Sequence, residues 1–339
     1  MNSKKSINKG VILAVASVIC VAAIFTAILL QSRNEYNKSF FYSMDTYVEI
    51  IGDNDIKDDV KRIFSDTELI FDNYNPESEI SELNQSKTMT VSPKLSEALE
   101  KIMLLNKTYG KGADITIGEI TSLWNITGDN PSVPTEEQIL SAMKTVGFEN
   151  IKLNENTVTL ENNAKLDSGC FAKGIALDFV KEEFDRLGAG KAVVSAGSSS
   201  ILLYGDDTFT TNILSPENDG ILGKLHTESG FVSTSGGYHR YTVIDNKEYI
   251  HIFDTRTGYP SETDLTSVTV FCRSGLDSDF LSTMIFADGS EKLSGYLNNE
   301  DFKIVAVDKD KNVYVSEGLE FELTDTSFKL CSQNLPSEN

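Results

Sequence analysis

The sequence has 339 residues, of which 40% are hydrophobic and 24% charged, a composition typical of a globular protein with a sizeable core. Its 51 acidic residues outnumber its 30 basic ones, so the formal net charge is −21. Such a surface repels the phosphates of nucleic acids and excludes nucleic-acid binding as the main function. A phosphorylated small molecule would need a metal ion or a well-placed lysine as a counter-charge.

An uncharged apolar segment, residues 11–30, follows three lysines near the N-terminus. A helix rises about 1.5 Å per residue, so these 20 residues would cover a hydrocarbon core about 30 Å thick. The positive-inside rule keeps residues 1–10 in the cytoplasm as a basic tail and places residues 31–339 outside. We therefore expect a single-pass protein of the cell membrane with an extracytoplasmic domain. A cleaved signal peptide or lipid attachment at Cys20 remains the alternative.

Beyond the apolar segment, polar residues 31–39 are expected to form a short tether. No internal repeat, low-complexity segment or linker divides residues 40–330, which predicts one folded domain there. Residues 331–339 form a polar tail. The three cysteines outside the apolar segment contain no CxxC pair, so they indicate neither a zinc site nor a disulfide framework.

Hydrophobic periodicity predicts the elements in chain order. Strands are expected at 44–51, 151–153, 157–160, 191–196, 303–307 and 313–316, the last two as a hairpin. Helices are expected at 55–73, 95–105, 135–145, 173–187 and 277–286. The third starts with a Thr135…Gln138 capping pattern, and the fourth buries Ile175, Phe179, Val180, Phe184 and Leu187 before stopping at Gly188. Without regular βαβ alternation, the fold class is α+β.

The segment LDSGCFAKG, residues 166–174, brings Lys173 and Gly174 to the start of the predicted helix 173–187. Free backbone N–H groups and the positive end of the helix dipole favour a phosphate there, and Lys173 adds a full charge. The spacings of a P-loop and of a GxGxxG motif are both absent. A solvated lysine at a helix start is the structural alternative.

Asp279 and Thr283 lie four residues apart, on one face of the predicted helix 277–286. A carboxylate and a hydroxyl on one face could hold Mg²⁺, which prefers hard oxygen ligands. The alternative is an acidic first turn that simply interacts well with the helix dipole.

Two of the three histidines fall within TSGGYHR (234–240) and HIFDTRTGYP (251–260). His251, expected in a strand, could accept a hydroxyl proton near neutral pH, although a histidine in a strand is commonly structural. The only tryptophan, Trp124, is expected to be a core residue in an irregular segment.

Together and in this order, these segments resemble the ApbE family of FAD:protein FMN transferases, from about Phe41 to Gly289. The resemblance rests on MDT (44–46), YNPESEISELN (74–84), DITIGEITSLW (114–124), LDSGCFAKGIALD (166–178), SAG (195–197), TSGGYHR (234–240), HIFDTRTGYP (251–260) and DFLST (279–283). It implies a single T-fold-type α+β domain behind the N-terminal transmembrane helix.

The resemblance also implies roles for individual residues. The backbone carbonyl of Cys170 and the side chains of Asp279 and Thr283 would bind Mg²⁺, and His251 is the candidate base. The residues expected at FAD are Met44, Tyr74, Asp114, Asp167, Lys173 and Phe253. The sequence departs from the family pattern at Cys170, Ser198 and Thr255, where a small residue, a second glycine and a proline are usual.

The reaction that the resemblance implies is Mg²⁺-dependent transfer of FMN from FAD to a Thr or Ser hydroxyl of an extracytoplasmic acceptor protein, with release of AMP. The partners would be FAD, the acceptor and, through residues 11–30, the membrane. An FAD pyrophosphatase that yields FMN and AMP, a non-enzymatic flavin-binding protein and an adhesion protein on the same scaffold are the alternatives. The presence of Asp279, Thr283 and His251 favours an enzyme.

Overall fold

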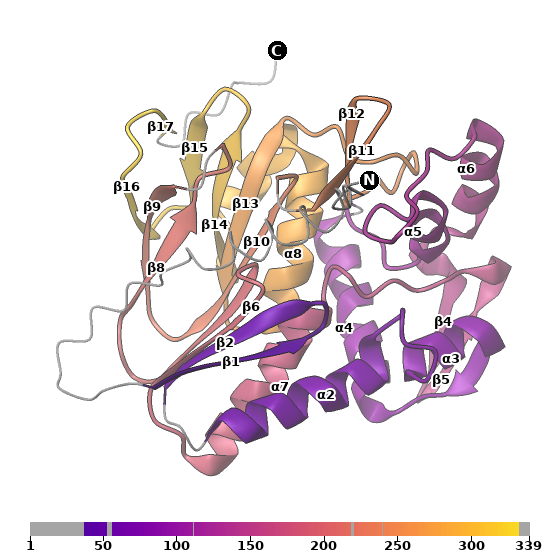
Figure 1. The fold of residues 1–339 in the computed structure, drawn as a ribbon, viewed down its shortest axis with the longest axis horizontal. Coiled ribbons are helices and arrows are strands. Elements are labelled where there is room, and N and C mark those ends of the chain that lie inside the picture. The colour runs from indigo at the N-terminus through magenta and orange to yellow at the C-terminus, as the bar shows by residue number, and fades with distance from the viewer. Residues whose placement is uncertain (1–36, 53–55, 111, 218–219, 239, 332–339) are drawn as a thin grey trace, which may run out of the picture.

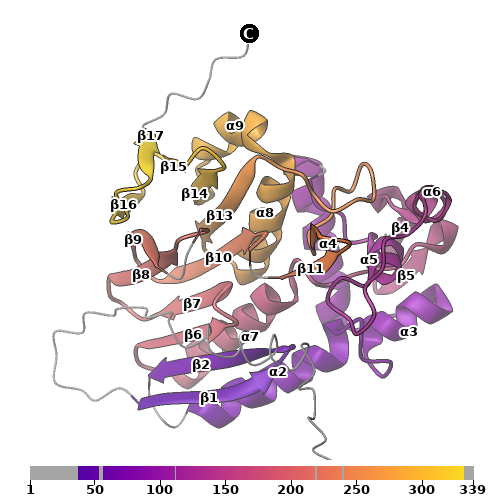
Figure 2. The same cartoon turned by 45° about the horizontal axis from the view of Figure 1, so that its top comes forward.

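The computed structural model describes residues 37–52, 56–110, 112–217, 220–238 and 240–331. Within them, a sheet of nine strands in the order β1-β2-β6-β7-β10-β13-β14-β15-β17 runs through the molecule (Figures 1 and 2). Neighbouring strands are antiparallel, except for the parallel pair β15 and β17. The strands are β1 (Asn37–Ser43), β2 (Thr46–Gly52), β6 (Ala192–Ala196), β7 (Ser200–Tyr204), β10 (Gly230–Gly236), β13 (Leu265–Cys272), β14 (Phe302–Asp308), β15 (Asn312–Val315) and β17 (Lys329–Cys331).

Three helices cover one face of this sheet, namely α2 (Lys57–Phe71), α7 (Ala172–Leu187) and α8 (Gly275–Asp288) (Figure 1). Their apolar faces pack on alternate residues of the strands, as the two-residue period of a strand requires. Phe64 of α2 and Phe184 of α7 are fully buried against this layer together with Val194 of β6. The layer therefore holds α7 and α8 in fixed positions under the central strands.

The opposite face of the sheet is covered by a second sheet, in the order β16-β9-β8. Val193, Ile201 and Val232 point to this side and form a separate apolar cluster with Phe209 and Leu225. The strands of the second sheet are β8 (Phe209–Leu214), β9 (Ile221–Thr227) and β16 (Glu320–Leu323).

A second group of helices lies beside α8 (Figure 2). It comprises α3 (Glu79–Ser86), α4 (Pro93–Tyr109), α5 (Gly118–Trp124) and α6 (Glu136–Ala142), with a small sheet of β3 (Thr88–Thr90), β5 (Thr157–Leu160) and β4 (Ile151–Asn154). The remaining elements are β11 (Tyr241–Ile244), β12 (Lys247–Ile250) and α9 (Leu293–Leu297). Short 3₁₀ helices span Met143–Thr145, Phe148–Asn150, Glu161–Asn163 and Ser290–Lys292.

The α+β class and the expected helices are confirmed. The capping box of Thr135 and Gln138 forms at the start of α6, and Gly188 ends α7 with a φ of 63°. The helices at 55–73 and 277–286 correspond to α2 and α8.

Six local predictions are wrong. The strand expected at 44–51 is broken by a tight turn, because Met44 and Asp45 have φ values of 51° and 52°. This turn pairs β2 with β1, which begins at Asn37, inside the segment expected to be a tether.

Leu187 is exposed at the last position of α7, and Trp124 lies on α5 instead of in an irregular segment. His251 follows β12 instead of lying in a strand, and β16 and β17 extend the domain beyond the expected last hairpin.

The predicted membrane anchor, residues 11–30, lies outside the described residues. Among the helices that the structure does describe, none combines the length and the apolar character needed to cross a bilayer. The membrane anchor therefore stays a prediction from the sequence.

Candidate active site

The turn before α7 is held by backbone and side-chain hydrogen bonds that deliver Lys173 to the first turn of the helix. The Asp167 carboxylate accepts the Gly169 N–H at 2.8 Å, and the Asp167 N–H donates to the Ile115 carbonyl at 2.7 Å. The N–H of Ala172, the first residue of α7, donates to the Ser168 carbonyl at 2.9 Å. The segment 166–174 thus forms the rigid turn and helix start that the sequence predicts.

Asp279 of α8 points at this helix start. It is 5% exposed, and its Oδ2 accepts the backbone N–H of Gly174 at 3.0 Å. The Lys173 Nζ lies 3.8 Å from the same oxygen, while Oδ1 accepts the Ser200 hydroxyl at 3.0 Å. The structure therefore brings Lys173 and Asp279 together as an ion pair, and the hydrogen bonds from Gly174 and Ser200 fix the buried carboxylate.

Thr283 lies one turn after Asp279 on α8, as expected. Its hydroxyl is 3.0 Å from that of Ser235, which is in turn 2.8 Å from the hydroxyl of Ser282. Ser235 at the end of β10 thus joins Ser282 and Thr283 of α8 in a row of three hydroxyl groups.

The donor set fits Mg²⁺ better than it fits a transition metal. Among the described residues, no group of three or more His, Cys, Asp or Glu side chains could hold a metal ion. One buried carboxylate, one hydroxyl and a backbone carbonyl are instead the hard oxygen donors that Mg²⁺ accepts, since it usually takes one or two carboxylates and completes its shell with substrate phosphates and water.

The thiol of Cys170 is unsuited to being a ligand or a nucleophile. Burial, and next the carboxylates of Asp167 and Asp279, raise the pKa of this thiol far above its ordinary value. A neutral thiol is a weak ligand, because the thiolate is the form that binds metals. The expected contribution of Cys170 through its backbone carbonyl is compatible with this neutral side chain.

Helix α5 joins the start of α7 to the loop at 251–260. The Thr121 hydroxyl donates to Asp167 Oδ2 at 2.8 Å, and one turn later the Trp124 indole donates to the Gly258 carbonyl at 2.9 Å. Trp124 also packs against Phe253, with ring centroids 6.2 Å apart. The fully buried Trp124 thus fixes the loop that follows His251 relative to Asp167.

The ring of His251 has a defined tautomer. Its Nδ1 lies 2.9 Å from the Arg240 carbonyl oxygen, and a carbonyl can only accept a hydrogen bond. In the neutral ring Nδ1 therefore has the proton, and Nε2 has the lone pair that a general base needs.

The other expected flavin residues occupy different settings. Met44 lies in the β1–β2 turn, where its N–H donates to Glu68 at 2.6 Å. Tyr74 lies at the surface, where desolvation and next the Asp167 carboxylate raise the pKa of its phenol. Asp114 accepts the N–H and hydroxyl of Thr116 at 2.8 and 2.6 Å, so it shapes the loop before α5.

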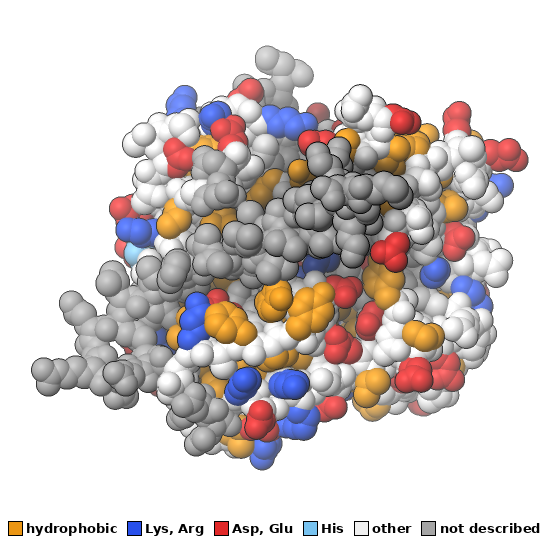
Figure 3. Space-filling view, in the orientation of Figure 1, with side chains coloured by type: hydrophobic (Ala, Val, Ile, Leu, Met, Phe, Trp, Pro, Cys, Tyr) orange, Lys and Arg blue, Asp and Glu red, His pale blue; other side chains and the backbone are white. Residues whose placement is uncertain are grey.

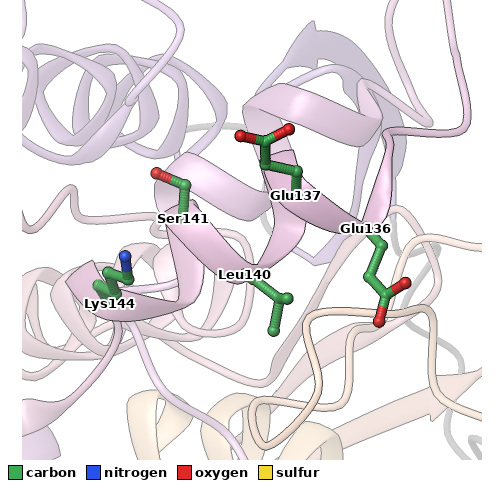
Figure 4. A pocket seen from close by; sticks show the side chains of 5 residues that line it. All are labelled: Glu136, Glu137, Leu140, Ser141 and Lys144. Atoms are coloured by element: carbon green, nitrogen blue, oxygen red, sulfur yellow. The ribbon is translucent and has the colours of Figure 1, made fainter.

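Two views put this site in its surroundings. Figure 3 shows hydrophobic side chains exposed over the β1–β2 hairpin next to acidic ones; the exposed residues there are Phe40, Tyr42 and Tyr47. A separate hollow lies along α6 and is lined by Glu136, Glu137, Leu140, Ser141 and Lys144 (Figure 4). None of the expected site residues lines that hollow, so it is not the candidate site.

Sequence reasoning missed Ser200, Ser235 and Thr121, which hold Asp279, Thr283 and Asp167. Single hydroxyl residues leave no periodic signal. Ser235 and Thr121 lie within TSGGYHR and DITIGEITSLW, and Ser200 follows SAG, but the sequence assigned them no role. The fold brings these hydroxyls from three distant elements to two carboxylates and a threonine.

The fold and the site define an α+β protein with a lysine-bearing helix start facing a buried carboxylate, an arrangement suited to a metal-assisted phosphate group. The model of the ApbE family matches residues 44–307. The chain therefore belongs to the ApbE family.

Relatives and solved structures agree with this assignment. The chain is 27% identical over 263 residues to a FAD:protein FMN transferase of Klebsiella pneumoniae, covering 75% of this chain and 83% of that protein. It is 26% identical over 287 residues to the transferase of the same name from Treponema pallidum, covering 77% and 79%. The ApbE protein of Thermotoga maritima superposes with a TM-score of 0.74 at 25% identity, covering 86% of this chain and 98% of that one. The flavin transferase ApbE of Vibrio cholerae, at 21% identity, shares the fold with a TM-score of 0.71 over 86% and 97% of the two chains.

Proposed function

We propose that this protein is an FAD:protein FMN transferase, which moves FMN from FAD to a Thr or Ser hydroxyl of an acceptor protein and releases AMP. The observation behind the proposal is the convergence of Lys173, the Gly174 N–H and Asp279 at the start of α7, in a chain of the ApbE family. The curated relatives of this chain bear the name of that activity.

Lys173 and the first N–H groups of α7 would bind the pyrophosphate of FAD. The lysine is mostly buried, with 18% of its side chain exposed, so its charge is only partly screened by water. The protein has a net charge of −21, so a dianionic substrate needs the local positive charge of Lys173 and the helix start in order to approach.

Mg²⁺ would be held by the Cys170 carbonyl, Asp279 and Thr283, where it supplies Lewis-acid polarisation and counter-charge for the pyrophosphate. Asp279 is the residue that this role requires to stay fixed. The Ser200 hydroxyl and the Gly174 N–H, which donate to its two oxygens, hold the carboxylate in place.

His251 would accept the proton of the attacking hydroxyl at its Nε2. The hydrogen bond from Nδ1 to the Arg240 carbonyl holds the ring in that tautomer and orientation. The attacking oxygen would form its bond to the FMN-side phosphorus as the bond from that phosphorus to the bridging oxygen breaks. AMP would leave with the electron pair of the broken bond, and Lys173 would stabilise its negative charge.

The test incubates purified protein with FAD, Mg²⁺ and candidate acceptor proteins from the same cell, and follows both AMP and acceptor-bound flavin fluorescence. We expect AMP and covalent flavin to appear in equal amounts. AMP with FMN but no covalent flavin would indicate the pyrophosphatase instead, and FAD binding without AMP would indicate a flavin-binding protein. In the same assay, Lys173→Ala should weaken FAD binding. Its matched control is Lys181→Ala, which removes a lysine on the same helix that pairs with Asp185 at 2.6 Å.

The domain organisation and location follow as part of the proposal. Residues 1–10 would be a cytoplasmic tail, residues 11–30 the membrane anchor and the folded domain extracytoplasmic, where it meets its acceptor. Full-length protein should fractionate with membranes and be digested by protease added to intact cells. A soluble cytosolic protein would contradict this location.

A further inference from the structure

Helices α7 and α8 meet at two glycines whose backbones touch. A Cβ on Gly174 would lie 2.1 Å from the Gly275 carbonyl oxygen, and a Cβ on Gly275 would lie 2.2 Å from the Gly174 carbonyl oxygen. Any side chain at either position would force the helices apart, since real carbon–oxygen contacts are longer than 3 Å. The crossing therefore leaves room only for glycine at these two positions.

Each glycine is followed by an aspartate four residues later, Asp178 on α7 and Asp279 on α8. Asp279 Oδ2 accepts the Gly174 N–H at 3.0 Å. Asp178 does the same in the other direction: its two oxygens accept the Gly275 and Leu276 N–H groups at 2.7 and 2.8 Å. Two G-x-x-x-D segments thus clamp each other, each aspartate binding the start of the opposite helix.

The two aspartates have different surroundings. Asp279 faces Lys173 and belongs to the site described above. Asp178 also accepts the Ser274 hydroxyl at 3.3 Å, and that hydroxyl accepts from the Lys101 Nζ at 2.7 Å. Asp178 is thus part of a second hydrogen-bonded cluster, at the start of α8 and outside the catalytic site.

We propose that Asp178 is a positioning residue for the transfer reaction, which fixes the start of α8 against α7 so that Asp279 and Thr283 face Lys173. The inference rests on the proposed function. The N–H groups of a helix start lack partners within the helix, so a carboxylate from another helix both satisfies them and sets the position of that helix. Because Asp279 is one turn along α8 from the two N–H groups that Asp178 binds, a shift of that turn moves Asp279.

The test compares Asp178→Asn with two control variants on α7. Asparagine keeps the shape of the side chain but has only one accepting oxygen for the two N–H groups. Asp185→Asn removes an exposed carboxylate from the same helix. Phe184→Leu destabilises α7 ten residues from Gly174, about 15 Å along the helix. It controls for any loss of thermal stability in Asp178→Asn. Asp178→Glu, which keeps the charge but is one methylene longer, is measured beside them in case the asparagine variant folds poorly.

Three readouts are taken for each variant: hydrogen exchange of the α8 start, FAD affinity with and without Mg²⁺, and the rate of transfer. We expect Asp178→Asn to speed exchange at Gly275 and Leu276, to raise the Mg²⁺ concentration for half-maximal FAD binding at least about tenfold, and to lower the transfer rate about 10- to 100-fold. Phe184→Leu should lower the melting temperature while leaving the exchange of the α8 start and the Mg²⁺ requirement within about twofold of wild type.

The outcomes separate the two proposals. If wild type binds FAD and transfers FMN, but Asp178→Asn matches Phe184→Leu in every readout, Asp178 is a purely structural residue and the inference is wrong. If wild-type protein neither binds FAD nor releases AMP, the proposed function is wrong, and the positioning role in that reaction is wrong with it. A smaller defect in Asp178→Glu than in Asp178→Asn supports positioning by the carboxylate.

Discussion

Replacing Gly174 with alanine tests whether the α7–α8 crossing sets the geometry of the site. The new Cβ would lie 2.1 Å from the Gly275 carbonyl oxygen and 2.7 Å from the Asp279 Cβ. Ordinary contacts between such atoms are about 3.5 Å, so the two helices must separate by roughly 1 Å. The same movement pulls the Gly174 N–H away from Asp279 and Lys173 away from its partner.

The expected cost has a structural part and a catalytic part. Overpacking of this kind costs about 1–3 kcal/mol of unfolding free energy, which chemical denaturation would measure. A displacement of about 1 Å in a catalytic group can cost about 100-fold in rate, so the transfer rate at saturating FAD should fall by that order. Both numbers are read from one purified variant, by a urea melt and by acceptor-bound flavin fluorescence.

Gly190→Ala is the matched control, because nothing lies within 4 Å of its Cβ position. It should keep full activity and be unchanged or stabilised by about 0.4–1 kcal/mol. A Gly174→Ala protein with wild-type stability and transfer rate would refute the claim that the close crossing holds Lys173 and Asp279 in place. A variant that loses stability but keeps its rate would show that the site tolerates the shift.

Four further substitutions and removal of the metal test separate parts of the reasoning. His251→Ala should leave FAD affinity within a few-fold but lower covalent flavin transfer at least about 100-fold, whereas Lys173→Ala should weaken FAD binding itself; a near wild-type rate without His251 would disprove the base. Asp279→Ala, or EDTA added to wild type, should abolish AMP release, and full activity in either case would remove Mg²⁺ from the mechanism. Ser198 has a φ of 65°, so Ser198→Gly should raise the unfolding free energy by about 1 kcal/mol in a urea melt; a loss of stability would mean that the serine side chain has a contact that offsets its strain.

Elements with strong periodicity could be predicted from the sequence, and those set by backbone turns could not. Helix α7 shows the first case: its apolar spacing predicted the burial of Ile175, Val180 and Phe184, and Gly188 predicted its end, although Leu187 is exposed. The β1–β2 hairpin shows the second, since positive φ values at Met44 and Asp45 go against the usual preferences of those residues. Gly197 packs beneath this turn, where a Cβ would lie 2.4 Å from the Thr46 hydroxyl, so a tertiary contact helps to stabilise what local propensity disfavours.

The site, too, could be predicted only in part from the sequence. Spacing on one helix predicted that Asp279 and Thr283 share a face, and both lie on α8, one turn apart, as that prediction requires. No spacing along the chain connects Lys173 with Asp279, which are 106 positions apart, and it is the glycine crossing of α7 and α8 that brings them within 3.8 Å. Gly174 and Gly275 thus determine the distance between the charges on which the proposed reaction depends. The proposed mechanism therefore depends on the backbone contact at Gly174 as well as on the charged side chains themselves.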